Sequence, residues 1–265
     1  MSGTLEGKVY IVTGASRGFG VAIARALLDA GARVGITGRQ AESIEASARA
    51  LGTPDRVIGL MADVGDETAV TAAFARIAAH FGRLDGLVNN AGLARPGAAD
   101  TQRPEEVRLQ VATNFTGTVI CCAAAIPLLR GSDNARIVNI SSASAEHHDE
   151  MSHLSICAAT KAAVERYSRD LRRELQPLGI GVTILRPGSA PTGFAEGWER
   201  ERFSAALEAW YRAGSEMDVG MDVSHVGASV AWCLASPPGV SVDLLEVRPC
   251  LRIAKPDPAV FMGGG

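Results

Sequence analysis

Short apolar segments alternate with amphipathic segments along most of the chain. Apolar runs typical of buried parallel strands occupy residues 9–12, 33–37, 56–61, 84–88, 136–140 and 180–185. Segments with apolar positions at helical spacing occupy residues 18–30, 41–51, 67–81, 105–129 and 157–175. Residues 241–248 form a candidate seventh strand. This alternation predicts a single α/β domain, in which helices cover both faces of a parallel sheet.

Two regions depart from this alternation. Residues 187–220 form a long connection that contains an amphipathic segment, residues 199–212, with aromatic side chains at helical spacing. Such aromatics are typical of core packing. A loop in this position also lies at the carboxyl edge of the sheet, where ligands bind, so a mobile lid over the substrate is the second interpretation. Residues 255–265 are rich in Pro and Gly, which predicts a disordered tail after a domain of residues 1–254.

Composition and charge narrow the classes of partner. The chain has 265 residues, of which 47% are hydrophobic, enough to bury one sizeable core. Its formal net charge of −3 gives no basic surface for nucleic acid or an anionic membrane. Residues 1–8 contain no apolar run that would indicate a signal peptide. The longest apolar stretch, residues 119–129, is too short to span a bilayer. We therefore expect a small-molecule substrate and neither nucleic acid nor membrane as a partner.

The cysteines give no metal or disulfide pattern. Cys121, Cys122, Cys157, Cys233 and Cys250 include no CxxC pair and no spacing typical of metal ligands. An odd and scattered set indicates reduced thiols and a cytoplasmic protein.

Two adjacent histidines, His147 and His148, lie in a polar segment at residues 145–150. Neighbouring residues do not share one face, and no third ligand is evident in the sequence, so we expect no metal site here. We expect this segment to be a solvent-exposed loop. The alternative is that one of the two histidines serves as a substitute catalytic acid.

A glycine-rich segment joins the first predicted strand to the first predicted helix. Gly14, Gly18 and Gly20 follow the pattern Gly-x3-Gly-x-Gly. Glycines at this place let the backbone approach a pyrophosphate closely, and the helix N-terminus adds unpaired N–H groups and the positive end of its dipole. Glycines that serve only tight turns are the alternative.

Further segments at the same edge of the sheet argue against that alternative. Asp63-Val64 follows the third strand, the sequence NNAG at residues 89–92 follows the fourth, and Pro187-Gly188 follows the sixth. With the sequence IVNISS at residues 137–142 and with Lys161, these segments resemble the short-chain dehydrogenase/reductase family over most of the chain, from about Leu5 to Arg248. The resemblance implies a Rossmann fold, with a doubly wound parallel sheet of seven strands in the order 3-2-1-4-5-6-7.

The resemblance also implies a nicotinamide cofactor at the carboxyl edge of this sheet. In the family, the aspartate after the third strand contacts the adenine, the residues after the sixth strand hold the nicotinamide, and the lysine holds the ribose. The implied cofactor-binding residues are Gly14, Ser16, Arg17, Gly18, Phe19, Gly20, Arg39, Asp63, Val64, Asn90, Ala91, Gly92, Lys161, Pro187, Gly188 and Thr192.

The end of the second strand favours NADP over NAD. NAD binders usually place an acid there, which accepts a hydrogen bond from the ribose 2′-hydroxyl. This chain has Gly38 at that position, followed by Arg39. A carboxylate would repel a 2′-phosphate, whereas Arg39 and Arg17 can bind one through charge-assisted hydrogen bonds. Each arginine alone is typical of a solvated surface charge. Together, at the phosphate positions of the family, they predict NADP.

The reaction centre lacks the residue that moves the proton in the family. There, a serine orients the substrate carbonyl, a tyrosine four residues before the lysine exchanges the proton, and an asparagine supports a proton-relay water. Carried over by position, the serine is Ser142, the asparagine is Asn114 and the lysine is Lys161. The tyrosine position holds Cys157.

The sequence leaves three roles open for Cys157. A thiol has an unperturbed pKa of about 8.5, and Lys161 one helical turn away would stabilise the thiolate, so Cys157 can assist proton transfer. Its side chain is much shorter than that of tyrosine, so it can instead only fill space while a water or a residue of the 145–150 segment supplies the proton. The third role is a nucleophile that attacks an aldehyde or an activated alkene. Loss of a general acid typically costs about 10² to 10⁴ in rate.

Two classes of function follow. The first is an NADP(H)-dependent oxidoreductase that passes a hydride between the cofactor and a carbonyl, an alcohol or an activated C=C bond, with an atypical proton donor. The second is a cofactor-binding protein with little redox activity, or one that uses Cys157 for non-redox chemistry. Aromatic side chains of residues 187–220 suggest an apolar or ring-containing substrate. The resemblance also implies a homo-oligomer, a dimer or tetramer, through the helices of residues 117–129 and of Lys161.

Overall fold

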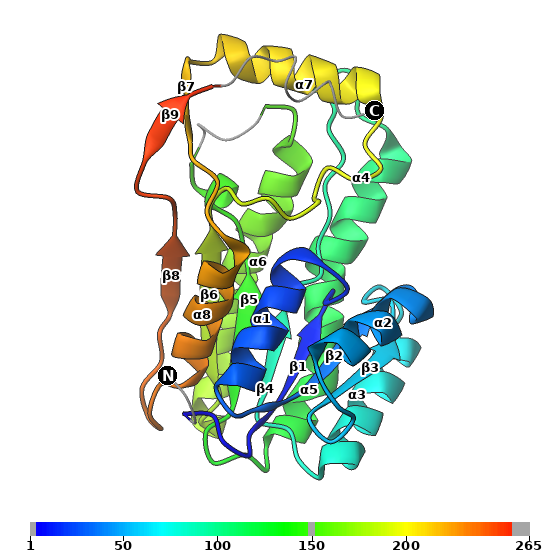
Figure 1. Cartoon of the computed structure of the whole chain (residues 1–265), viewed down its shortest axis with the longest axis vertical. Coiled ribbons are helices and arrows are strands. Elements are labelled where there is room, and N and C mark those ends of the chain that lie inside the picture. Colours follow the sequence, from blue (N-terminus) through cyan, green and yellow to red (C-terminus); the bar gives the residue numbers. More distant parts are fainter. Residues whose placement is uncertain (1–3, 148–151, 256–265) are drawn as a thin grey trace.

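The computed structural model describes residues 4–147 and 152–255. Its central sheet has seven parallel strands in the order β3-β2-β1-β4-β5-β6-β8, which confirms the predicted topology (Figure 1). These strands are β1 (Val9–Thr13), β2 (Arg33–Gly38), β3 (Val57–Met61), β4 (Gly86–Asn89), β5 (Arg136–Ile140), β6 (Gly181–Pro187) and β8 (Leu244–Val247). The seventh strand of the sheet is β8 because a short strand, β7 (Glu216–Asp218), pairs instead with β9 (Arg252–Ala254) in a separate antiparallel ribbon. His148 and nearly all of the predicted tail, residues 256–265, lie outside the described residues.

Both faces of the sheet are buried, because successive side chains of a strand point to opposite faces. On β1, Tyr10 and Val12 pack into one apolar cluster, while Val9 and Ile11 pack into a second. The first cluster lies against α1 (Gly18–Asp29), α2 (Ala41–Leu51) and α8 (Val223–Leu234), and the second against α3 (Glu67–Phe81), α5 (Gly117–Leu129) and α6 (Ser155–Leu175). The continuous apolar runs of the sequence are therefore strands covered on both sides.

One long helical segment runs from α4 (Pro104–Val111) through a π-helical turn, Ala112–Thr116, into α5. This segment is 26 residues long and contains an 18-residue window with a mean hydropathy of 1.6, so by length and composition alone it could span a membrane. In this fold its buried residues, which include Cys121 and Leu129, pack into the second apolar cluster, so it serves as a core helix. The π-helical turn interrupts the regular register at Asn114, and such turns are frequent at functional sites.

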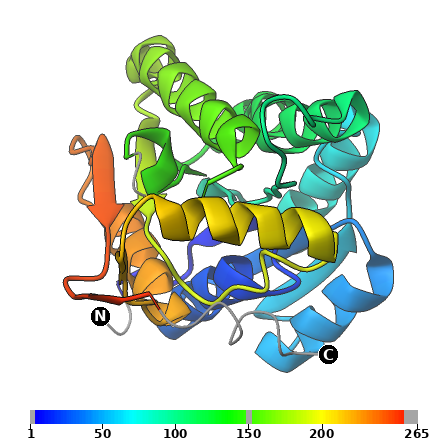
Figure 2. The ribbon, with the colours of Figure 1, turned by 90° about the horizontal axis from the view of Figure 1, so that it is seen from above.

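Residues 187–220, which we call the roof, pass over the carboxyl edge of the sheet. They contain α7 (Arg200–Arg212), which lies across the top of the molecule (Figures 1 and 2). Leu207 and Trp210 of α7 are buried, as the core-packing interpretation expects. Phe194, by contrast, is 41% exposed. The roof therefore combines a packed helix with a more open segment before it.

The contact between α1 and α8 gives a prediction about stability. A Cβ atom at Gly227 of α8 would lie 2.5 Å from the carbonyl oxygen of Ala22 on α1. Because backbone can yield only by shifting a helix, Gly227→Ala should lower the free energy of unfolding by about 1–3 kcal/mol. Urea denaturation measures this change.

Gly131→Ala is the matched control for this substitution. Nothing lies within 4 Å of a Cβ atom at Gly131, so its effect should stay below about 0.5 kcal/mol. Equal stabilities of the Gly227→Ala variant and the unsubstituted protein would contradict the close packing of the two helices.

Candidate active site

Three loops meet at the carboxyl edge of the sheet, after β1, β4 and β6. Gly14 and Gly18 have φ values of +64° and +54°. A Cβ atom at Gly14 would lie 2.7 Å from the Cα of Ala91, and one at Gly18 would lie 3.0 Å from the carbonyl oxygen of Thr192. Only glycine combines this backbone conformation with such close approach. The glycine-rich segment is thus in contact with the predicted cofactor segments after the fourth and sixth strands.

Hydrogen bonds between β1 and the loop after β4 hold this meeting point. The Thr13 hydroxyl oxygen accepts from the backbone N–H groups of Asn90 and Ala91, both at 3.1 Å. The Asn90 side-chain amide donates to the carbonyl oxygens of Thr13 at 2.9 Å and Gly14 at 3.1 Å. Thr13 is absent from the predicted site residues, and a hydroxyl residue at the end of an apolar strand is the signal that points to it.

The start of α1 and the ends of β2 and β3 carry the other predicted cofactor residues. Arg17 is the N-cap of α1 and makes no side-chain capping bond, so the first N–H groups of the helix have no side-chain acceptor from it. Ser16, Arg39 and Asp63 are exposed, and Val64 is buried. Phe19 packs against the first apolar cluster, while Gly188 is fixed by a 2.8 Å bond from its N–H to the carbonyl oxygen of Val247, next to Pro187.

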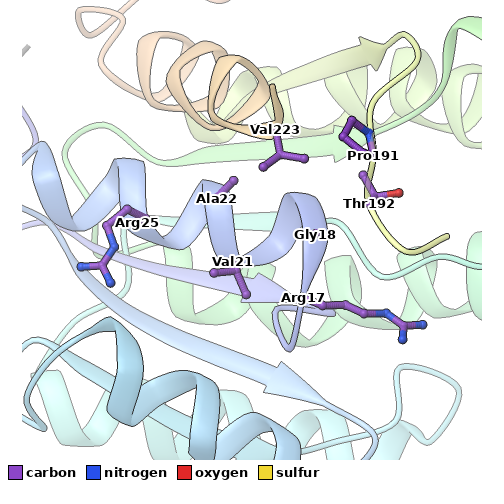
Figure 3. A pocket seen from close by; sticks show the side chains of 8 residues that line it. All are labelled: Arg17, Gly18, Val21, Ala22, Arg25, Pro191, Thr192 and Val223. Atoms are coloured by element: carbon purple, nitrogen blue, oxygen red, sulfur yellow. The ribbon is translucent and has the colours of Figure 1, made fainter. Parts of the chain in front are cut away.

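A cavity of about 420 Å³ lies beside the glycine-rich segment (Figure 3). Its lining residues come from α1, from the loop after β6 and from the start of α8: Arg17, Gly18, Val21, Ala22, Arg25, Pro191, Thr192 and Val223. Arg25 donates to the carbonyl oxygens of Ala50 and Leu51, so it caps the C-terminal end of α2. Figure 3 shows Arg17 extending away from Arg25, at the other end of the cavity.

Asn114, Cys157 and Lys161 come together beside Gly92. A Cβ atom at Gly92 would lie 3.3 Å from Lys161 Nζ and 3.5 Å from Asn114 Oδ1. Asn114 Nδ2 lies 4.0 Å from Cys157 Sγ. The structure thus brings three of the four predicted catalytic residues next to the loop that borders the glycine-rich segment.

Ser142 follows the end of β5, where Lys161 also makes contact. Lys161 Nζ donates to the carbonyl oxygen of Ile140 at 2.7 Å. The Ser142 hydroxyl oxygen accepts from the backbone N–H of Ser144 at 3.2 Å and from the Ser144 hydroxyl at 2.8 Å. Because Ser142 accepts in both bonds, its own hydroxyl hydrogen is available to donate.

Burial decides the protonation of the reaction centre. Cys157 is 5% exposed and Lys161 is 8% exposed. Burial raises the pKa of the Cys157 thiol, although the positive charge of Lys161 acts in the opposite direction. Burial likewise lowers the pKa of the Lys161 ammonium, with Cys157 opposing the shift. The thiol therefore keeps its proton at neutral pH, and this environment does not favour a nucleophilic thiolate.

A buried ion pair supports the end of β5. The Ser141 hydroxyl donates to Glu165 Oε1 at 2.7 Å, and Glu165 accepts two bonds of 2.6 Å each from Arg186. Arg186 also contacts Glu146 at 3.0 Å and Glu246 at 3.3 Å. Sequence reasoning missed this network. Arg186 within an otherwise apolar strand is the signal for it, because a buried charge needs a partner.

The polar loop after β5 is attached to this network. His147 Nε2 lies 2.7 Å from Glu246 Oε1, and its side chain is 33% exposed, so the imidazole is paired and also partly open to solvent. Within residues 4–147 and 152–255, no group of three His, Cys, Asp or Glu side chains is placed to hold a metal ion.

The roof is tied to the loop after β4. Trp198 Nε1 donates to the carbonyl oxygen of Ala94 at 2.9 Å. Ion pairs add to this bond: Arg17–Glu196, Arg103–Glu199 and Arg202–Glu106. These polar contacts connect residues 196–202, just before and at the start of α7, to other segments around the site. They agree with the interpretation of this segment as a lid.

Comparisons with known proteins agree with this arrangement. The family model for short chain dehydrogenase matches residues 8–202. Sulfoacetaldehyde reductase 2 of Chromohalobacter salexigens is 33% identical over 246 residues, which cover 91% of this chain and 94% of that protein. The closed form of serine dehydrogenase complexed with NADP+ has a TM-score of 0.78 at 28% identity, covering 91% of this chain and 94% of that one. The 3-ketoacyl-(acyl-carrier-protein) reductase from Brucella melitensis, complexed with NADH, has a TM-score of 0.79 at 28% identity, covering 93% and 98%.

The burial of the cysteines predicts a single fast-reacting thiol. Cys250 is exposed, whereas Cys121, Cys122, Cys157 and Cys233 are buried, and burial raises the thiol pKa of each of these four. At about pH 8, Ellman's reagent should label Cys250 quickly and the others only on unfolding. Cys250→Ser should remove the fast phase. A fast phase that survives this substitution but is lost in Cys157→Ser would contradict the buried, protonated state of Cys157.

Proposed function

Because this chain belongs to the short chain dehydrogenase family, we propose that it is an NADP(H)-dependent oxidoreductase that transfers a hydride between the cofactor and a carbonyl or alcohol group of a small molecule. An activated C=C bond is a variant acceptor. The observation that carries this proposal is the placement of Lys161 and Asn114 beside Gly92, on the loop that contacts the glycine-rich segment. The activities in the names of its relatives, two reductases and a dehydrogenase, support the same reaction class.

The residues at the carboxyl edge fit a dinucleotide. Side chains at Gly14, Gly18 or Gly20 would collide with the neighbouring loops, and the first N–H groups of α1 have no side-chain cap from Arg17, as expected where a pyrophosphate binds. When bound, the nicotinamide cofactor supplies or accepts the hydride. Arg39 and Arg17 would hold the 2′-phosphate of NADP, with Arg17 exchanging its ion pair with Glu196 for the phosphate, in accord with the NADP+ bound to the serine dehydrogenase neighbour.

We further propose that Ser142 and Lys161 carry the proton chemistry without a tyrosine. The Ser142 hydroxyl can donate to a substrate carbonyl oxygen, since both of its bonds with Ser144 use it as an acceptor. The lowered pKa of Lys161 makes its ammonium a better proton donor than an ordinary lysine. Cys157, protonated and buried behind Asn114, then fills the space of the missing ring.

A second candidate function rests on the same cysteine. A buried thiol with a raised pKa is a poor substitute for the tyrosine, which favours a cofactor-binding protein with little redox activity. The family resemblance also leaves a homo-oligomer through α5 and α6 as a prediction.

Restoring the family residue tests the proposal. NADPH oxidation is followed with a panel of aldehydes and ketones, and Cys157→Tyr should raise kcat/KM by about 10² to 10⁴ because it supplies a general acid. Cys157→Phe is the matched control, since it adds the ring without the hydroxyl and should give no gain. Lys161→Met should abolish reduction in both backgrounds.

The outcomes separate the two functions. Measurable reduction by the unsubstituted protein, lost in Lys161→Met, supports the oxidoreductase. Turnover only in Cys157→Tyr identifies a cofactor-binding protein that has lost activity. Loss of activity in Cys157→Tyr would show that Cys157 takes part in the native reaction, and no NADPH oxidation by any variant would contradict the oxidoreductase proposal.

The residue at the end of β2 gives a prediction about cofactor choice. The nearest atom to a Cβ atom at Gly38 would be a side-chain atom of Ile44 at 3.4 Å, an ordinary contact distance, so a side chain is tolerated there. Gly38→Asp should weaken NADPH binding about tenfold or more, through repulsion of the 2′-phosphate, and strengthen NADH binding. Gly38→Asn, of nearly the same shape but uncharged, is the control. An unchanged ratio of the two dissociation constants would contradict the assignment of this position.

A further inference from the structure

A short segment, residues 93–95, which we call the strip, lies between the reaction centre and the roof and is hydrogen-bonded to both. The Leu93 N–H donates to Asn114 Oδ1 at 2.8 Å, and the Leu93 carbonyl accepts from Asn114 Nδ2 at 2.9 Å. The Arg95 N–H donates to the fully buried Gln110 side chain at 3.1 Å. Asn114 and Gln110 therefore hold the two ends of the strip.

The residue between these two ends, Ala94, bonds to the roof. The carbonyl oxygen of Ala94 accepts from Trp198 Nε1 at 2.9 Å and also from Arg95 Nη1 at 2.8 Å. A Cβ atom at Gly197 would lie 3.9 Å from Arg95 Nη2. The Arg95 guanidinium thus lies under the roof, next to Gly197 and Trp198. Its backbone lies two residues, at most about 7 Å, from Leu93, which Asn114 of the reaction centre binds directly.

The charge of Arg95 is not balanced by the residues that the structure describes. Three other arginines around the roof pair with carboxylates: Arg17 with Glu196, Arg103 with Glu199 and Arg202 with Glu106. Arg95 has no carboxylate within ion-pair distance among residues 4–147 and 152–255, and its guanidinium bonds only to the Ala94 carbonyl there. A guanidinium has five N–H donors in a planar fork that matches a carboxylate, so a half-buried one retains several donors for a ligand.

The aromatic side chains of the roof contact one another and other parts of the protein. Trp198 packs edge-on against both Phe194 and Phe203, with ring centroids 6.0 and 5.5 Å apart. Trp210 is buried, and Lys255 Nζ lies 4.5 Å from its ring centroid. Each of these rings already contacts another side chain of the protein. We therefore infer the substrate class from the Arg95 guanidinium and not from the aromatic rings.

We propose that Arg95 determines specificity by binding an anionic group, a carboxylate or sulfonate, of the substrate. The substrate class is then a carbonyl or alcohol compound with an acid group a few bonds from the reacting carbon. This inference rests on the proposed function, because it assigns the substrate of the same site. Arg95 acts through binding and touches no reacting atom.

Paired substrates test this assignment. The probes are 4-oxobutanoate and its uncharged methyl ester, reduced by NADPH with the unsubstituted protein or with Cys157→Tyr as the more active background. The acid should have a kcat/KM about 10- to 100-fold above that of the ester, as expected for hydrogen bonds to a charged group. Arg95→Gln should remove the difference by raising KM for the acid, with kcat and the ester little changed. Arg95→Lys should restore part of it.

Arg103→Gln is the matched control, because it removes an arginine at the same rim that is already paired with Glu199. It should leave the preference for the acid intact. Equal kcat/KM for acid and ester in the unsubstituted protein, or an equal loss for both in Arg95→Gln, would overturn the assignment.

A binding measurement keeps the inference separate from the proposed function. Calorimetric titration of the NADP+-saturated protein with 4-hydroxybutanoate should give a dissociation constant that Arg95→Gln raises about tenfold or more. Such binding without turnover of either aldehyde would contradict the oxidoreductase proposal alone. Turnover of both aldehydes without an effect of Arg95→Gln on either measurement would contradict the role of Arg95 alone.

Discussion

The close approach of three backbone loops at the carboxyl edge of the sheet is the constraint on which the site depends. Gly14 lies so near Ala91 that a Cβ atom would come within 2.7 Å of its Cα, and the Thr13–Asn90 hydrogen bonds hold the two loops together. The next residue of the same loop, Gly92, borders Lys161 and Asn114. The glycine-rich segment and the reaction centre are thus joined through the loop after β4. A displacement of that loop would alter both.

The sequence predicted the alternating strands and helices from local periodicity and the glycine-rich segment from its motif. The strand order and the cluster of Asn114, Cys157 and Lys161 followed from the resemblance to a known family. The sequence did not predict contacts between distant side chains. The Glu165–Arg186 pair joins a helix to a strand, and the Arg95–Ala94–Trp198 contacts join a loop to the roof. The pairing of β7 with β9 was missed for the same reason, since each is only three residues long. Such contacts depend on tertiary geometry that periodicity does not encode.

The chemistry of the site is shaped by burial as much as by the missing tyrosine. Burial raises the pKa of the Cys157 thiol and lowers that of the Lys161 ammonium, so both neutral forms are favoured relative to a solvated pair. In the proposed reaction, the lowered pKa of the Lys161 ammonium favours proton transfer to a carbonyl group, while the positive charge of Arg95 under the roof suits an acid elsewhere on the same molecule. In this account, the reacting end and the recognised end of the substrate are held by different elements.

The binding of NADP(H) at the carboxyl edge of the sheet can be measured by titration of the purified protein with NADPH and with NADH at matched salt, followed by nicotinamide fluorescence. We expect tight binding of NADPH and weak binding of NADH, because Arg17 and Arg39 can hold the 2′-phosphate and Gly38 offers no carboxylate to the ribose. If neither nucleotide binds, the cofactor assignment is wrong and the Rossmann scaffold serves another purpose.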